Sequence, residues 1–118
     1  MNKREAKRLG RHHGRDLAAF NIPKIGQRID KSIDPVIGGL DPLTGLGEKV
    51  TEDNVKEYHE LLCFAAADHS RCYSPAEFLA KEFNDAGDRA NGLWDAYEDG
   101  VARTIRAEVR KFTVEDYR

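Results

Sequence analysis

The sequence predicts an all-α fold, in which a compact bundle of about four to five helices forms a single domain over residues 1–118. Apolar residues recur at three- and four-residue steps through most of the chain, which is the period of one helix face. The length of 118 residues fits one domain, and one Trp, four Tyr and five Phe supply apolar groups that disordered chains lack. Turn-forming residues gather in one loop at residues 34–50.

The first expected helix spans residues 3–20 and is rich in basic side chains. Its apolar face follows the helical period and is predicted to comprise Ala6, Leu9, His13, Leu17 and Phe20. Gly10 and Gly14 weaken the helix, but glycines four residues apart let a second backbone approach closely. A mobile amino terminus that becomes ordered on contact with a partner is the alternative.

A second helical stretch is expected over residues 22–33, followed by the loop. Its stripe is Ile22, Ile25, Ile29 and Ile33. Pro23 suits a first turn, and Asp34-Pro35 ends the helix because the residue before proline avoids helical angles. The loop from Asp34 to Gly47 mixes Asp-Pro and Gly turns with apolar residues, so it either packs on the domain or contacts a partner.

Residues 52–69 form the strongest core candidate. Thr51 precedes the helix, and Glu52 and Asp53 suit its positive end. One face is predicted to hold Val55, Tyr58, Leu62, Ala65 and Ala66. Further apolar residues make its second half apolar almost all round, namely Leu61, Cys63, Phe64 and Ala67. That pattern is typical of a buried central helix.

Two more helices complete the predicted bundle. Ser74-Pro75-Ala76-Glu77 has the pattern of a capping box, and Gly87 is placed to end the helix that follows. The last helix, residues 91–112, carries a stripe of Trp94, Tyr97, Val101, Ile105, Val109 and Phe112. Its opposite face holds Arg103, Arg106 and Arg110, with Asp99 placed to pair with Arg103. Residues 113–118 are expected to be a short tail.

The net charge of −2 conceals a strong asymmetry. Residues 1–28 hold eight basic and two acidic side chains, a net charge of +6, whereas the other ninety residues hold eleven basic and nineteen acidic ones, a net charge of −8. Such a division often marks a segment that meets an acidic partner, but the basic helix can equally lie on the acidic body of its own fold. Both interpretations stay open.

The basic residues of the first helix are candidates for binding phosphates or a protein partner. The candidates on this helix, which share one side of it, are Arg4, Lys7, Arg8, Arg11 and Arg15. His12 and His13 could add charge below neutral pH. Arg103, Arg106 and Arg110 form a second candidate surface.

The sequence predicts no catalytic residues, no cofactor and no metal site, and therefore no enzyme. His59, Cys63, His69 and Cys72 are zinc ligand types, but one straight helix cannot bring all four to one ion. We expect instead a buried Cys63, a surface His59, and His69 with Cys72 at a helix end; a break of the helix near His69 is the alternative that would bring the four ligands together. Two unpaired cysteines and the lack of a long apolar run or signal peptide predict a soluble, cytoplasmic protein without membrane contact.

Three short segments together resemble small uncharacterised helical proteins of bacteriophages and mobile elements. They are Tyr73-Ser-Pro-Ala-Glu-Phe78, Glu82-Phe-Asn84 and Trp94-Asp-Ala-Tyr-Glu-Asp-Gly100. The resemblance implies an accessory factor that acts in the host cytoplasm and binds and modulates a host protein or nucleoprotein complex, including a defence system. The alternatives are a nucleic-acid-binding protein that uses the amino-terminal helix, and a structural or assembly protein. The oligomeric state stays open, a dimer included.

Overall fold

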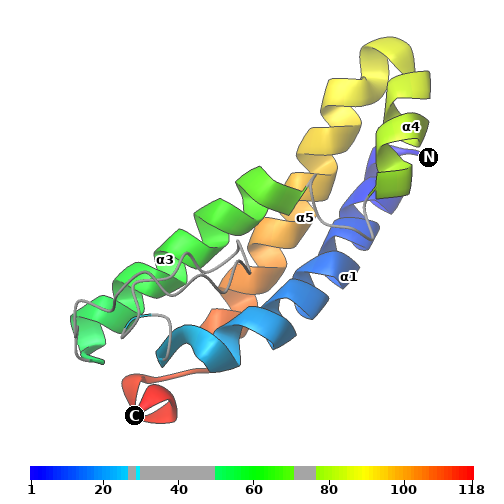
Figure 1. The fold of residues 1–118 in the computed structure, drawn as a ribbon. Coiled ribbons are helices and arrows are strands. Elements are labelled where there is room, and N and C mark those ends of the chain that lie inside the picture. Colours follow the sequence, from blue (N-terminus) through cyan, green and yellow to red (C-terminus); the bar gives the residue numbers. More distant parts are fainter. Residues whose placement is uncertain (27–28, 30–49, 71–76) are drawn as a thin grey trace.

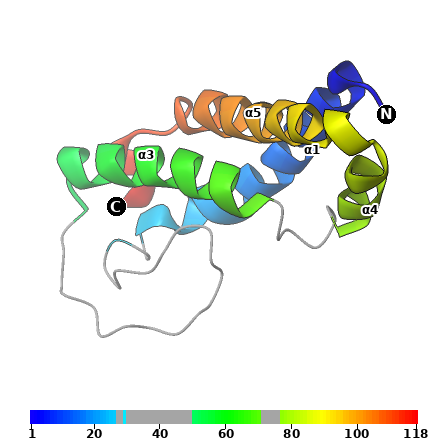
Figure 2. The same ribbon diagram turned by 90° about the horizontal axis from the view of Figure 1, so that it is seen from above.

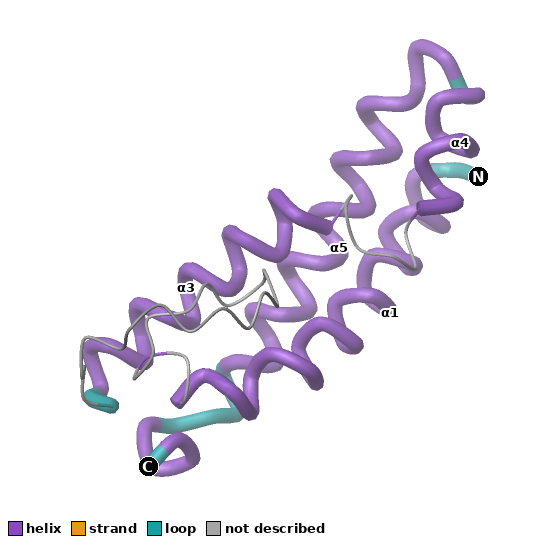
Figure 3. Tube along the Cα trace, viewed as in Figure 1, coloured by secondary structure: helices purple, strands orange, loops and turns teal. Residues whose placement is uncertain are grey.

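Every element that the computed structural model describes is helical (Figure 3). The structure describes residues 1–26, 29, 50–70 and 77–118. The α-helices are α1 (Lys3–Asn21), α3 (Glu52–His69), α4 (Glu77–Asp85) and α5 (Ala90–Val109). Three 3₁₀ turns accompany them, namely η1 (Ile22–Lys24), η4 (Gly87–Arg89) and η5 (Val114–Tyr117). The all-α prediction is confirmed. Ile33, the loop at 34–49 and the Ser74–Ala76 part of the expected capping box lie outside the described residues.

Helix α5 is the centre of the fold. It contacts α1, α3 and α4, and Figures 1 and 2 both show it with α1 and α3 alongside. The molecule is elongated, with principal extents of 47 × 27 × 17 Å. The expectation that the helix at 52–69 would be central is therefore wrong, because α3 packs along one side of α5 and leaves its own outer side exposed.

Helices α1 and α5 run in the same direction and touch through glycine. Gly10 lies against Tyr97 and Gly100, and Gly14 lies against Val101 and Thr104. A Cβ added at Gly10 would fall 3.0 Å from the carbonyl carbon of Tyr97 and 3.2 Å from the Cα of Gly100, closer than packed carbon atoms normally approach. The close approach expected from glycines four residues apart is thus present, with α5 as the second backbone.

The helix ends follow local capping rules. Asn2 accepts a hydrogen bond from the backbone N–H of Glu5 at 2.9 Å, and Thr51 accepts one from Asn54 at 3.2 Å. Both side chains satisfy an N–H that the first helical turn leaves free. Gly87 follows α4 with φ of +62°, a conformation that glycine adopts without a steric penalty. The predicted start at Glu52 and the predicted glycine end are confirmed.

The core gathers around the apolar stripe of α5. Tyr97, Val101 and Ile105 have no exposed surface, and the Trp94 ring meets Phe83 of α4 edge to face at 4.8 Å. Leu62 of α3 and the isoleucines at 22, 25 and 29 are also fully buried. The predicted α5 stripe is therefore confirmed from Trp94 to Val109, where the helix ends, whereas Phe112 lies beyond that end and is only partly buried.

Four large apolar residues expected in the core face solvent instead. Phe20 of α1 is 54% exposed, and Leu61 and Phe64 of α3 are 45% and 68% exposed. Phe78 of α4, which the sequence pattern places on a buried side with Leu79 and Phe83, is 57% exposed. Phe20 lies under the Lys24 ammonium, whose Nζ is 3.6 Å from the ring centroid. The reason is geometric: each of these helices has one side against α5, and among the described helices none covers the apolar residues that lie outside that side.

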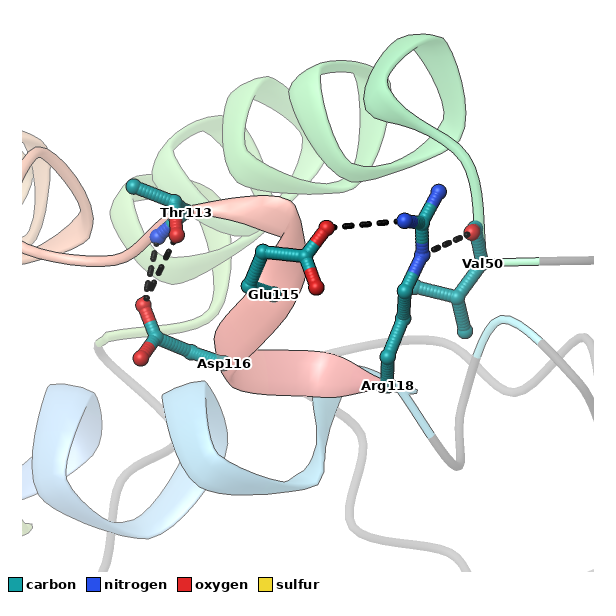
Figure 4. A network of polar contacts seen from close by, with 5 residues as sticks. All are labelled: Val50, Thr113, Glu115, Asp116 and Arg118. Atoms are coloured by element: carbon teal, nitrogen blue, oxygen red, sulfur yellow. Dashed lines mark hydrogen bonds and ion pairs between the residues drawn. The ribbon is translucent and has the colours of Figure 1, made fainter.

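Residues 113–118 do not form a free tail. Thr113 and Asp116 make a capping box for η5, and Arg118 reaches Glu115 at 2.8 Å and the carbonyl of Val50 at 3.5 Å (Figure 4). Tyr117 is half-buried and lies against Gly26. The segment thus closes the end of the bundle, which corrects the sequence-based expectation.

Candidate functional site

The arginines of α1 face solvent while the helix is docked. Arg4, Arg8, Arg11 and Arg15 are exposed, and within the described ranges no ion pair joins any of them to an acid. The side of α1 that meets α5 consists of small and apolar residues and His13. The basic helix therefore does lie on the rest of the fold, but its arginines take little part in that contact.

Among the described residues, Lys7 is the one basic residue of this row that joins α1 to another helix by an ion pair. Its Nζ lies 3.1 Å from Oδ2 of Asp99, and the same carboxylate accepts a hydrogen bond from Arg103 Nε at 3.0 Å. Slight burial raises the pKa of Asp99, but the hydrogen bonds from Arg103 and Lys7 outweigh this and hold it below its ordinary value. The expected Asp99–Arg103 pair is confirmed.

The shared carboxylate brings the basic rows of α1 and α5 to one side of the helix pair. Arg103, Arg106 and Arg110 are exposed and border the same shallow depression as Asp99. In parallel helices that touch through glycine, Lys7 and Arg103 can meet at one carboxylate only if both point to the same side. We call this surface the basic face, and it comprises Arg4, Lys7, Arg8, Arg11, Arg15, Arg103, Arg106 and Arg110.

The two neighbouring histidines of α1 have different surroundings. His12 is exposed, with Nε2 3.8 Å from Asp16. His13 is 4% exposed, and its Nδ1 is 2.6 Å from the hydroxyl of Tyr97. Burial, aided by the charge of His12, lowers the pKa of His13. His13 therefore becomes charged only at lower pH than an exposed histidine, and its ring lies against Tyr97 of α5 rather than among the arginines of the basic face.

The side chains considered as zinc ligands have other roles where they are described. His59 is half-buried rather than a surface residue, and its Nε2 is 2.7 Å from the hydroxyl of Tyr117. Cys63 is 4% exposed, as expected, and burial raises the pKa of its thiol. His69 is the last residue of α3, but its side chain and Cys72 lie outside the described residues. In the part of the chain that the structure describes, no group of three or more His, Cys, Asp or Glu residues could hold a metal ion.

A second surface was not expected from the sequence. Glu57, Glu60, Leu61 and Phe64 project from one side of α3, and all four are exposed. We call it the α3 patch. The sequence shows both its apolar and its acidic residues, but it does not show that none of the described helices covers them, so no local signal could have identified the patch.

Comparisons with known proteins found no matching family model, and no curated protein or solved structure is significantly similar to this chain. The resemblance to phage proteins over residues 73–100 therefore stays a prediction. Among the described helices, none is long and apolar enough to span a membrane.

Proposed function

We propose that this protein is a non-enzymatic interaction protein that binds a partner with an anionic surface through the basic face. The observation that carries the proposal is that α1 docks on α5 through glycines and apolar residues, while its arginines stay exposed. Folding alone does not require that arrangement, since in the described part of the fold these arginines join no ion pair.

The arrangement has a cost to the isolated protein. Arg4 and Arg8, and likewise Arg11 and Arg15, are four residues apart on one helix. Like charges at this spacing destabilise a helix by about 0.2–0.5 kcal/mol per pair. An anionic partner would offset this repulsion, because each guanidinium would then gain a charge-assisted hydrogen bond.

The proposal includes the biological role that the resemblance implies. We propose that the protein is a phage-type accessory factor, with the anionic surface belonging to a host protein or nucleoprotein complex, including a defence system. In this proposal binding alters the host component without any chemical step, and no cofactor is required.

Retention on a heparin column measures the affinity of the basic face for a polyanion. The test variant replaces Arg8 and Arg15 by Gln, and the control replaces Lys24 and Lys81, which belong to η1 and α4. Both variants lose two positive charges. We expect the wild type and the control to elute at similar salt, and the Arg8→Gln/Arg15→Gln variant to elute much earlier. Equal elution of the two variants would refute the proposal.

The α3 patch supports a second candidate function, a contact with a protein whose surface combines apolar and basic groups. Two acids flank the exposed Leu61 and Phe64, which gives the patch charge complementarity to such a partner. Phe64→Ser should leave stability unchanged and reduce recovery of the partner from host lysate. Recovery at the wild-type level would exclude the patch.

A further inference from the structure

We infer that the anionic partner is a nucleic-acid duplex, bound through its phosphate backbone by α1 and α5 together. The inference rests on the proposed function and specifies the partner of the same surface. Three observations support it: the register of the two helices, the length of the basic face, and the kind of side chains on it.

The glycine contact fixes the register of α1 against α5. Lys3 lies beside Gly92 and Gly14 beside Thr104, so facing residues differ by 89 or 90 in number. In this register Arg110 lies level with residue 20 of α1. The basic face therefore runs from Arg4 to that level, 16 residues, which is about 24 Å at 1.5 Å per residue.

A duplex backbone matches this length and charge density. Double-stranded DNA carries one negative charge per roughly 1.7 Å of axis, so about 24 Å contains some 14 phosphates, or about seven base pairs. Six cations of the basic face have no ion pair within the described ranges, namely Arg4, Arg8, Arg11, Arg15, Arg106 and Arg110. Few folded protein surfaces offer a comparable line of anions.

The residue types also favour phosphate and favour a duplex over a single strand. Seven of the eight cations are arginines, whose planar guanidinium binds phosphate oxygens in pairs. Proteins that bind single strands add exposed aromatic rings on which bases stack. The exposed phenyl ring on α1, that of Phe20, is nine residues from Arg11 and thus about 180° around the helix, away from the basic face.

Asp99 makes the two rows a single surface. Its carboxylate pairs with both Lys7 and Arg103, close to the glycine contact of the two helices, and its negative charge offsets the repulsion between the two cations. Contacts of this kind fix position on the backbone without reading bases, so binding is expected to be independent of sequence.

Fluorescence anisotropy of the full chain with labelled 16-base-pair duplexes, one DNA and one RNA, tests the inference between 50 and 200 mM salt. Six phosphate contacts predict a slope of log K against log salt near −5, or roughly a 10³-fold loss of affinity across this range. Either duplex bound with this slope supports the inference. A hairpin with a four-base-pair stem, which is shorter than the basic face, should bind more weakly.

Matched variants show whether both helices take part. Arg106→Gln/Arg110→Gln on α5 and Arg8→Gln/Arg15→Gln on α1 should each make the slope less steep by about 2. Lys24→Gln/Lys81→Gln, with the same change of net charge, should leave the slope unchanged. Urea unfolding of each variant verifies that it is folded.

Several outcomes overturn the inference. The same assay is run with one strand of the duplex alone and, by competition, with poly-glutamate. Tighter binding to the single strand or to poly-glutamate than to either duplex overturns the inference, and so does a salt slope that Arg106→Gln/Arg110→Gln leaves unchanged. If the protein is retained on heparin through Arg8 and Arg15 but binds neither duplex, only the duplex is refuted. If retention is lost as well, the proposed function also fails.

Discussion

Gly10→Ala should destabilise the protein, although alanine is the better helix former. The added Cβ would lie 3.0 Å from the carbonyl carbon of Tyr97, and the carbonyl oxygen is nearer still. Favourable contacts between carbon atoms begin at about 3.5 Å, so the new methyl is at least 0.5 Å too close. The clashing atoms are backbone atoms of α5, and a side-chain rotation cannot relieve the overlap.

The expected magnitude follows from two opposing contributions. Overpacking costs about 1–3 kcal/mol, and two rigid backbones place this site at the upper end. Alanine recovers about 1 kcal/mol of helix propensity relative to glycine. The free energy of unfolding should therefore fall by about 2 kcal/mol. For a chain of this length about 4 °C corresponds to each kcal/mol, so Tm should fall by about 8 °C.

Urea unfolding followed by circular dichroism measures the change, with Gly92→Ala as the matched control. A Cβ at Gly92 would meet only the flexible end of the Lys3 side chain, with Cε at 2.9 Å. That variant should be neutral or up to about 1 kcal/mol more stable than the wild type. If Gly10→Ala is as stable as Gly92→Ala, the helices do not pack through glycine, and the register used for the basic face is wrong.

Three further results are expected. Leu62→Ala, at a fully buried site, should lower the free energy of unfolding measured in urea by about 2–5 kcal/mol, whereas Leu61→Ala at the neighbouring exposed site should lower it far less. Equal losses would show that Leu62 does not lie on the side of α3 that faces α5. Burial lowers the pKa of His13 and of His59 in the folded state, so the unfolded chain binds protons at higher pH than the folded one. The contribution of these two histidines to stability is therefore fully present above about pH 6.5 and is lost as the pH falls below that value. His13→Gln/His59→Gln should flatten the pH dependence of the free energy of unfolding measured between pH 7.5 and 5.5. Burial raises the pKa of the Cys63 thiol and shields it from solvent. In a Cys72→Ser background this thiol should therefore react slowly with a thiol reagent in the native protein and rapidly in urea. Rapid reaction of the native protein would contradict its burial.

Local signals predicted where the described helices lie. Thr51, which caps the helix, and the turn-forming Gly87 act through their own backbone neighbours, so the start of α3 and the end of α4 can be predicted from a few residues. Most of the stripe on α5 was also predictable, because its large apolar residues recur within one arc; the buried Leu93 was missed because it lies outside that arc, on the side towards α1. Arg4, Arg8, Arg11 and Arg15 were found for the same reason, since their spacing alone places them on one side.

Contacts between distant segments could not be predicted in this way. The second half of α3 is apolar all round, and only the position of α5 decides that Leu62 is buried while Phe64 is exposed. His13 and His59 each have a tyrosine hydroxyl partner far along the chain, which no local pattern indicates. Likewise the sequence shows two basic rows, but it does not show that Asp99 joins them.

The pairing of α1 with α5 also has a consequence for how the chain folds. His13 meets Tyr97 across 84 positions, and Met1 meets Arg89 across 88, unlike the local contacts that let most helical bundles fold in microseconds to milliseconds. At 5–20 residues per second, a ribosome needs roughly 4–18 s to make the 90 residues between facing positions. During synthesis α1 therefore spends seconds without its glycine partner, with its arginines already available to any polyanion nearby. If the basic face binds a polyanion as proposed, the nascent chain can make that contact before its final packing, and complete folding should follow the emergence of α5.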